Sequence, residues 1–327
     1  MRWTGTFVGG ASAFLAELAN RPLPPTLFFE TKANLTKGQL RVLARAGVRE
    51  LQPGIESFST PILKLMDKGV TALQNVRLLK WCAELGIRPF WNILYGFPGE
   101  EPAEYERMAQ LIPSLTHLAP PYGTLKLRMD RFSPNFDQAA ARGFVEVRPA
   151  EAYRHVYPLA PEAMSRLAYY FDYAYADGRD PTVYAAPVHA AVEQWLAASG
   201  AARLELHGED DCLEIRDSRP VASSETTVLR GAARLAYLAL DDGRTLRDVM
   251  TVLRRELGDD TPAAEHVEIW LTAWEAARLV MREGARYLSL ATNPAERVPL
   301  PIERLLALMR PPAHRQAERS QPEPVAT

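Results

Sequence analysis

The chain has 327 residues, of which 47% are hydrophobic and 24% are charged. This is the composition of a globular protein with room for two domains. The formal net charge of -2 excludes an overall basic footprint for nucleic acid, and two distant cysteines, Cys82 and Cys212, exclude a disulfide framework and a cysteine-rich metal site. No apolar run approaches the ~20 residues of a membrane span, so we expect a cytoplasmic protein without membrane contact.

The first part of the chain alternates short apolar runs with amphipathic stretches, a pattern typical of parallel strands joined by helices. We predict strands at residues 26–31, 48–55, 87–95 and 124–130. Capping boxes beginning at Thr36 and Thr71 start two of the intervening helices, and Thr60-Pro61 starts a third. Cys82 lies beside the apolar stripe of the helix after Thr71, so we expect a buried, inert thiol.

Residues 144–200 read as a helical connector. Met164, Leu167, Phe171 and Ala174 recur at spacings of three and four, which predicts the buried stripe of one helix after Pro161. The neighbouring tyrosines, from Tyr169 to Tyr175, have a second interpretation as the lining of a substrate cleft.

A second module is predicted from residue 201. A hairpin at 203–216, helices at 227–240, 245–257 and 264–283, and a strand at 286–290 make up the parts of a winged helix. The proline-containing tail beyond about Pro311 is expected to be disordered. The predicted domains are 1–140, 141–200, 201–292 and a partly disordered tail at 293–327.

Two predicted strands end in residues suited to ligand binding. The second ends in Gln52, Gly54, Glu56 and Ser57, and the third ends in Asn92, Tyr95 and Gly96. Ligands of parallel α/β folds lie at the carboxyl ends of strands, where glycines allow close backbone approach and polar side chains donate or accept hydrogen bonds. Taken singly, each glycine is equally well explained as a turn and Glu56 as a solvated acid.

The segments FFETKANLT, LQPGIESFS, LMDKGVTALQNVRLLKWCAELGI, WNILYGFPGE and LRMDRFSPNFD resemble the later part of the radical S-adenosylmethionine (SAM) enzymes that mature ribosomally made peptides, especially the cobalamin-binding branch. The resemblance runs from about residue 26 to 137. It implies an α/β fold with the later strands of a partial radical SAM barrel, followed by the helical connector and the winged-helix-like module.

The resemblance also implies cofactors and site residues. Family members bind S-adenosylmethionine, a 4Fe-4S cluster through a CxxxCxxC loop, and in this branch cobalamin. Glu56 and Ser57 match the polar pair that contacts the nucleoside or methionyl part, and Asn92, Tyr95 and Gly96 match the segment that cradles ribose and adenine. Gln52 and Gly54 belong to the first of these motifs, and Lys32 lies on the strand whose end faces the methionyl group.

The chain departs from this family in its cysteines. It has no CxxxCxxC motif, and two cysteines cannot supply the three thiolates of the cluster, so no metal ligand and no catalytic residue is assigned. The missing strands and the cobalamin domain would lie before Met1. We therefore expect a fragment, a split gene or a degenerate paralogue that is inactive alone, with the missing half as a separate partner chain.

The winged-helix-like module resembles domains that grip the leader of a precursor peptide, as a strand added to a sheet edge beside the last long helix. The rival interpretation is DNA binding through Arg254 and Arg255 or Arg278 and Arg282, but nearby acids dilute this charge and no nucleic-acid partner is predicted. The six histidines show no metal-ligand spacing. The predicted function is that of a truncated radical SAM peptide-maturation enzyme, in a family whose reactions include methyl transfer. The alternative is a non-catalytic adaptor that binds the leader peptide.

Overall fold

The computed structural model describes residues 9–21, 26–208 and 211–299. The first part of the fold is built on short parallel strands, β1 (Leu27–Glu30), β2 (Val48–Gln52), β3 (Arg88–Pro89), β4 (Ile93–Tyr95) and β5 (Thr124–Lys126). They form a sheet in the order β1-β2-β3 and a pair β4-β5, all parallel. A parallel bridge between Glu56 and Ile93 joins the two sheets.

The helices that alternate with these strands are α1 (Gly9–Ala19), α2 (Lys37–Arg45), α3 (Thr60–Leu65), α4 (Ala72–Leu85), α5 (Pro102–Leu111) and the 3-10 turn η1 (Ile112–Leu115). The predicted capping boxes of α2 and α4 are confirmed: the Thr36 and Thr71 hydroxyls each accept a hydrogen bond from the third residue of the helix. Gly86 ends α4 with φ 71°, a conformation that glycine adopts without a Cβ penalty.

The predicted strand at 87–95 is two strands. Phe90 N–H still donates to Leu51 of β2, but Ile93 N–H donates to Gly123 and Leu94 N–H donates to Glu56, so the chain changes partners within three residues. The predicted strand at 48–55 ends at Gln52, because Pro53 lacks a backbone donor. The last predicted strand of this part is likewise divided, into β5 and β6 (Met129–Asp130).

Residues 128–175 form a separate antiparallel unit, called the arm here. Its elements are β6, α6 (Pro134–Asp137), β7 (Phe144–Pro149), α7 (Ala152–Val156), α8 (Pro161–Leu167) and β8 (Tyr170–Tyr175), and its sheet order is β6-β8-β7. The prediction of one helical connector is therefore wrong up to Tyr175. Met164 is buried but Leu167 is 49% exposed, and Phe171 is buried by strand alternation. Helix α9 (Pro181–Ala198) follows.

The C-terminal module contains the predicted hairpin, β9 (Leu204–His207) and β10 (Cys212–Asp217), extended by β11 (Thr226–Arg230) in the order β11-β10-β9. Its further elements are α10 (Gly231–Ala239), η2 (Leu240–Asp242), β12 (Arg244–Thr245), α11 (Leu246–Leu257), η3 (Gly258–Asp260), α12 (Ala264–Ala276), β13 (Val280–Glu283), β14 (Arg286–Ser289) and η4 (Pro294–Glu296). The helices predicted at 227–240 and 264–283 are shorter, because β11 occupies the start of the first and β13 the end of the second.

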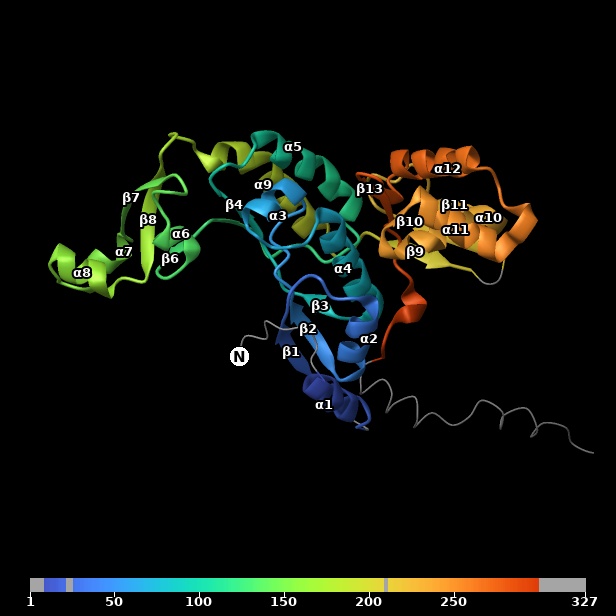
Figure 1. Cartoon of the computed structure of the whole chain (residues 1–327), viewed down its shortest axis with the longest axis horizontal. Coiled ribbons are helices and arrows are strands. Elements are labelled where there is room, and N and C mark those ends of the chain that lie inside the picture. The colour runs from blue at the N-terminus through green and yellow to red at the C-terminus, as the bar shows by residue number, and fades with distance from the viewer. Residues whose placement is uncertain (1–8, 22–25, 209–210, 300–327) are drawn as a thin grey trace, which may run out of the picture.

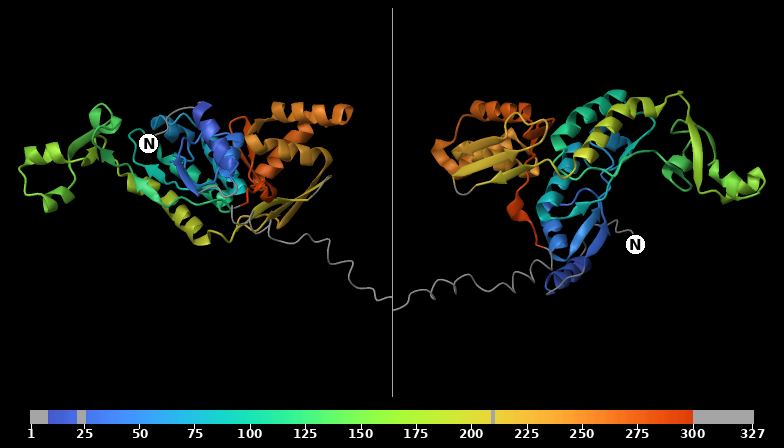
Figure 2. Two further views of the ribbon diagram at one scale, coloured as in Figure 1. Left: turned by 90° about the horizontal axis from the view of Figure 1, so that it is seen from below. Right: turned by 180° about the vertical axis from the view of Figure 1, so that it is seen from behind.

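The arm and the C-terminal module lie at opposite ends of the molecule, with the parallel strands between them (Figure 1). Both further views show the same arrangement (Figure 2). One continuous apolar core runs from the parallel strands into the C-terminal module, whereas the arm has a small core of its own. Among the described residues, no helix is long and apolar enough to cross a membrane. The tail predicted to be disordered beyond Pro311 lies outside the described residues.

Candidate functional site

The carboxyl ends of β1 and β2 bring together a small set of charged and flexible positions. Gly54 has φ 60°, and a side chain there would lie within 4 Å of Thr31 O, the Glu56 carboxylate and the Lys68 ammonium. The Lys68 Nζ donates to Glu56 Oε1 at 3.0 Å, and both side chains remain partly exposed. The edge therefore carries one carboxylate and one ammonium side by side.

Three predicted site residues are free to bind a ligand. Lys32 follows β1 and Gln52 ends β2, and both are exposed, while Asn92 precedes β4 and is half-buried. Within the part of the chain that the structure describes, none of these three side chains makes a hydrogen bond or an ion pair. They give the strand ends one cation and two amides without internal partners.

Ser57 and Gly96, by contrast, already have internal partners. Ser57 is fully buried; its hydroxyl donates to the Met108 sulfur and accepts from Ser59 N–H. Gly96 N–H donates to Glu100 at 2.8 Å, and its carbonyl accepts from the Tyr175 hydroxyl at 2.6 Å. The predicted roles of these two residues toward a nucleoside stay predictions, and the bonds shown are structural.

Gly96 is also the place where the arm meets the strand ends. A Cβ at this position would lie 2.6 Å from the Tyr175 hydroxyl, and φ is 95°, so packing alone requires glycine. Tyr95, the neighbouring predicted residue, is half-buried, and its carbonyl accepts from Leu127 N–H at the root of the arm.

The carboxylate of Glu100 fixes the conformation of the loop that follows Gly96. This carboxylate is buried and accepts hydrogen bonds from Gly96 N–H and from the Tyr184 hydroxyl of α9. Burial raises the pKa of Glu100 above its ordinary value, although these hydrogen bonds oppose the shift. The loop is thereby tied to α9 as well as to the arm.

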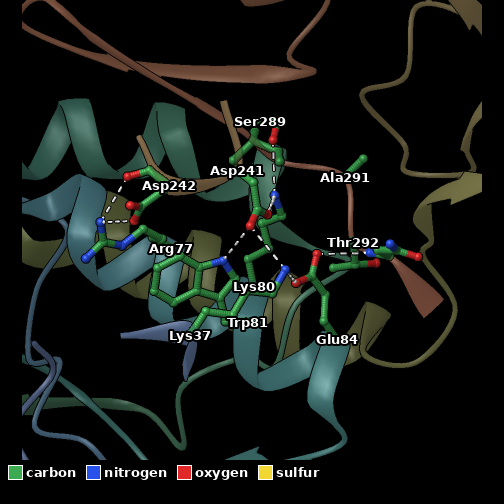
Figure 3. Close-up of polar contacts among 12 residues, drawn as sticks. Lys37, Arg77, Lys80, Trp81, Glu84, Asp241, Asp242, Ser289, Ala291 and Thr292 are labelled. Carbon is green, nitrogen blue, oxygen red and sulfur yellow. Dashed lines mark hydrogen bonds and ion pairs between the residues drawn. The ribbon is translucent and has the colours of Figure 1, made fainter. Parts of the chain in front are cut away.

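A second polar cluster lies where α4 meets the C-terminal module, and we call it the junction (Figure 3). Lys80 is 1% exposed, and its ammonium lies 2.7 Å from Asp241 Oδ1 and 3.0 Å from the Ser289 hydroxyl. Asp241 also accepts from Lys37 and from the Trp81 indole. A buried ammonium without such partners would be very costly, so this cluster fixes how the two parts pack.

The ionisation of the junction follows from its geometry. Burial alone would raise the pKa of Asp241, but the ammonium groups of Lys80 and Lys37 lower it from 3.8 to about 2. Burial raises the pKa of Glu84, although Lys80 and Lys37 oppose the shift; one of its carboxylate oxygens accepts from Asn293 N–H. These groups are structural partners of one another and face no open strand end.

Other contacts extend the junction on both sides. Arg77 bonds Asp242 and stacks over the Trp81 ring, and Arg219, paired with Asp217, donates to Ser114 O. Nε2 of His117 lies 2.9 Å from Leu290 O; burial lowers the pKa of His117 to about 3, so the neutral ring donates there.

Neither cysteine is placed to hold an iron-sulphur cluster. Cys82 is fully buried in α4, which confirms the predicted burial of this thiol, and burial raises its pKa to about 12. Cys212 lies on β10 of the other module. Among the described residues no group of three or more His, Cys, Asp or Glu side chains is arranged to hold a metal ion. The two cysteines present do not fit a 4Fe-4S cluster, which in radical SAM proteins requires the three thiolates of a CxxxCxxC motif.

Comparison with known proteins addresses the first part of the chain. Residues 11–112 match the family model described as the Radical SAM superfamily. The segment begins within α1 and ends at the start of η1, so it includes β1 to β4 and both motif-bearing strand ends. The predicted likeness to radical SAM proteins is confirmed over residues 11–112, which we call the radical SAM segment. No curated protein matches the chain.

Two solved structures of a radical S-adenosylmethionine methyltransferase, TsrM from Kitasatospora setae, are similar to parts of the chain. The first contains a tryptophan substrate and a SAM analog; it is 18% identical over 57% of this chain and 41% of that one, with a TM-score of 0.42. The second contains cobalamin and a [4Fe-4S] cluster; it is 20% identical over 58% of this chain and 40% of that one, with a TM-score of 0.39. The chain spans about two fifths of the length of TsrM.

Sequence reasoning missed Lys68 and the whole junction. Lys68 lies in the quoted segment LMDKGV, twelve positions after Glu56, but its contact with Glu56 depends on how α3 returns the chain to the strand ends. The junction joins residues about 160 positions apart, such as Lys80 and Asp241, and no local motif links them.

The junction predicts unequal effects for two neutralising substitutions. Lys80→Met should lower the free energy of unfolding by about 2–4 kcal/mol, because it leaves Asp241 without its closest cation. The loss should be smaller than for a fully buried pair, because the Asp241 side chain is partly exposed. Asp242→Asn, at a side chain that is 59% exposed, should cost about 0–1 kcal/mol. Urea denaturation monitored by circular dichroism measures both, and equal losses would contradict the assignment of Lys80 as the central contact.

Proposed function

We propose that this chain acts in the maturation of a ribosomally made precursor peptide, binding the leader of that peptide through its C-terminal module and S-adenosylmethionine at the strand ends of its radical SAM segment. The observation that carries the proposal is the free edge of β11. In the sheet β11-β10-β9, the far side of β9 is occupied by a bridge from Glu205 to Thr292, whereas β11 pairs with β10 alone among the described strands.

The edge of β11 suits a peptide that adds as a strand. Asp217 N–H donates to Glu225 O, and antiparallel pairs alternate, so the backbone groups of Thr226, Val228 and Arg230 point away from β10. Thr226 N–H and C=O already bond the Ser224 hydroxyl, and the Arg230 carbonyl lies at the N-cap of α10, which leaves both groups of Val228 and the Arg230 N–H for a ligand. The Val228 side chain on this edge is 49% exposed. Unpaired backbone groups beside an exposed apolar side chain are what recognition by strand addition uses. On that basis we propose that this winged-helix-like module binds the leader peptide at the edge of β11.

The strand ends of the radical SAM segment suit S-adenosylmethionine by their chemistry. Its methionyl part carries an ammonium and a carboxylate, and Glu56 and Lys68 offer the opposite charge to each. The amides of Asn92 and Gln52, which make no hydrogen bond within the described residues, can bond hydroxyls of the ribose or the adenine. In the proposed complex these residues bind and orient the nucleoside, and Gly54 keeps the backbone accessible beside them.

The proposal does not give this chain radical chemistry of its own. A bound cluster would supply the electron that cleaves S-adenosylmethionine, but Cys82 is buried and Cys212 lies in the other module, so neither can serve it. We propose that a separate partner chain supplies the cluster thiolates. The adaptor function remains the second candidate: it shares the β11 site for the peptide and lacks the nucleoside.

Substitution of Val228 tests the peptide site. Val228→Pro removes one outward N–H while leaving the ladder to β10, so the dissociation constant of a fluorescein-labelled leader peptide, taken from the short reading frames beside the gene, should rise about five- to tenfold in fluorescence anisotropy. Val228→Ala keeps the N–H and serves as the matched control, with a smaller loss expected. Unchanged affinity of the proline variant would refute strand addition at β11.

Calorimetric titration with S-adenosylmethionine tests the nucleoside site. Glu56→Gln should weaken binding about tenfold or more, because it removes a charged acceptor for the methionyl ammonium. Glu101→Gln, an exposed acid at the start of α5, should leave binding unchanged. No binding to the unaltered chain, together with intact leader binding, would decide for the adaptor.

Anaerobic iron-sulphur reconstitution tests the absence of radical chemistry. The chain alone should retain no stoichiometric cluster and should not cleave S-adenosylmethionine, because the described fold brings no three thiolates together. Iron analysis and detection of 5'-deoxyadenosine by chromatography give the result. A brown protein with about four irons that forms 5'-deoxyadenosine would overturn this part of the proposal.

A further inference from the structure

The open face of the parallel sheet carries a group of stacked side chains that the proposed function does not use. Phe28 of β1 and Phe90 after β3 meet edge-on with ring centroids 5.9 Å apart, and Phe90 stacks on Tyr122 at 5.1 Å with an interplanar angle of 11°. The Arg88 guanidinium lies 4.9 Å from the Phe90 centroid and donates to the Tyr122 hydroxyl at 2.7 Å. We call these four residues the aromatic platform.

The aromatic platform lies on a face of the parallel sheet that α2 and α4 do not cover. Phe28 is 47% exposed and Tyr122 is 52% exposed. Helices α2 and α4 lie on the side of the strands that faces the C-terminal module (Figure 1), and α4 contacts both β3 and β13. Parallel sheets normally bury both faces, and grouped exposed aromatic side chains mark binding surfaces.

From this surface we infer a second binding site, for an aromatic side chain flanked by basic residues in a peptide. The nearly parallel rings of Phe90 and Tyr122 present a flat surface, and a further ring placed on the exposed part of Tyr122 would continue the stack. The inference rests on the proposed function for its biological setting, in which this peptide is the segment of the precursor to be modified.

The charges around the aromatic platform select the peptide. Register pairs Phe28 with Glu50 and Glu50 with Arg88, and Glu30 lies two positions after Phe28 on the same face. In the described part of the chain, the carboxylates of Glu30 and Glu50 make no ion pair, while Arg88 is engaged by the rings and the Tyr122 hydroxyl. Two unpaired carboxylates beside the rings attract a lysine or arginine of the ligand and repel the phosphates of a nucleic acid, while the exposed Lys32 lies beyond Glu30, after the end of β1.

The aromatic platform also adjoins the candidate nucleoside site. Gln52 follows Glu50 by two positions on β2, so its amide lies on the same face, toward the carboxyl end of the strand. A peptide side chain held on the platform would therefore lie beside the end of the sheet where S-adenosylmethionine is proposed to bind.

The test uses a pentapeptide, Gly-Lys-(5-fluoro-Trp)-Lys-Gly, titrated with the full chain and followed by the broadening of its fluorine resonance. Tyr122→Ala should raise the dissociation constant about three- to tenfold, as expected for the loss of one aromatic contact. Glu50→Gln, which preserves shape and packing, should raise it about two- to fivefold. Tyr157→Ala, at a comparably exposed tyrosine of the arm, is the matched control and should change nothing.

Several results would overturn the inference. These are no broadening at millimolar protein, equal effects of Tyr122→Ala and Tyr157→Ala, binding of a glutamate-flanked peptide as tight as that of the lysine-flanked one, or displacement of the peptide by oligothymidylate. Val228→Pro should leave this short peptide unaffected, because it contains no leader. Leader binding at β11 and pentapeptide binding at the aromatic platform are therefore tested separately, and either proposal can fail while the other holds.

Discussion

The contact between Lys80 and Asp241 is the constraint on which the arrangement of this protein depends. Lys80 belongs to the α4 helix of the radical SAM segment, and its ammonium is almost completely removed from water. Such a charge is tolerated only when oxygen atoms surround it, and these come from Asp241 and Ser289 of the C-terminal module. The apolar core continues through the same region, so the two parts pack as one unit.

This junction assigns different roles to the two faces of the parallel sheet. The helical side is closed by packing against the C-terminal module, and its buried polar groups have partners within the chain. The other face keeps Phe28 and Tyr122 exposed, and within the described residues the side chains of Glu30, Glu50 and Gln52 on it have no internal partner. Recognition is therefore proposed for the open face and for the distant edge of β11, while the junction holds the module that bears β11 against α4.

Much of the local structure could be predicted because its causes are local. The capping boxes at Thr36 and Thr71 and the glycine stop at Gly86 involve neighbours within a few residues, and each is present. The helix predicted through Phe171 failed because spacings of three and four also occur by chance in a short helix followed by a strand; pairing of Phe171 with Met129 and Pro149 outweighed the pattern. Ser57 and Gly96 were recognised as special positions, but the structure shows internal bonds for both.

The sequence by itself determined the alternation of strands and helices, the motif-bearing strand ends, the likeness to radical SAM proteins and the shortage of cysteines, since all of these are properties of residue type and short spacing. Only the tertiary structure decided that Lys68 reaches Glu56, that Tyr175 reaches Gly96 and that Lys80 meets Asp241. Those pairs are 12, 79 and 161 positions apart. Their contacts depend on how whole elements pack, which composition and periodicity do not specify.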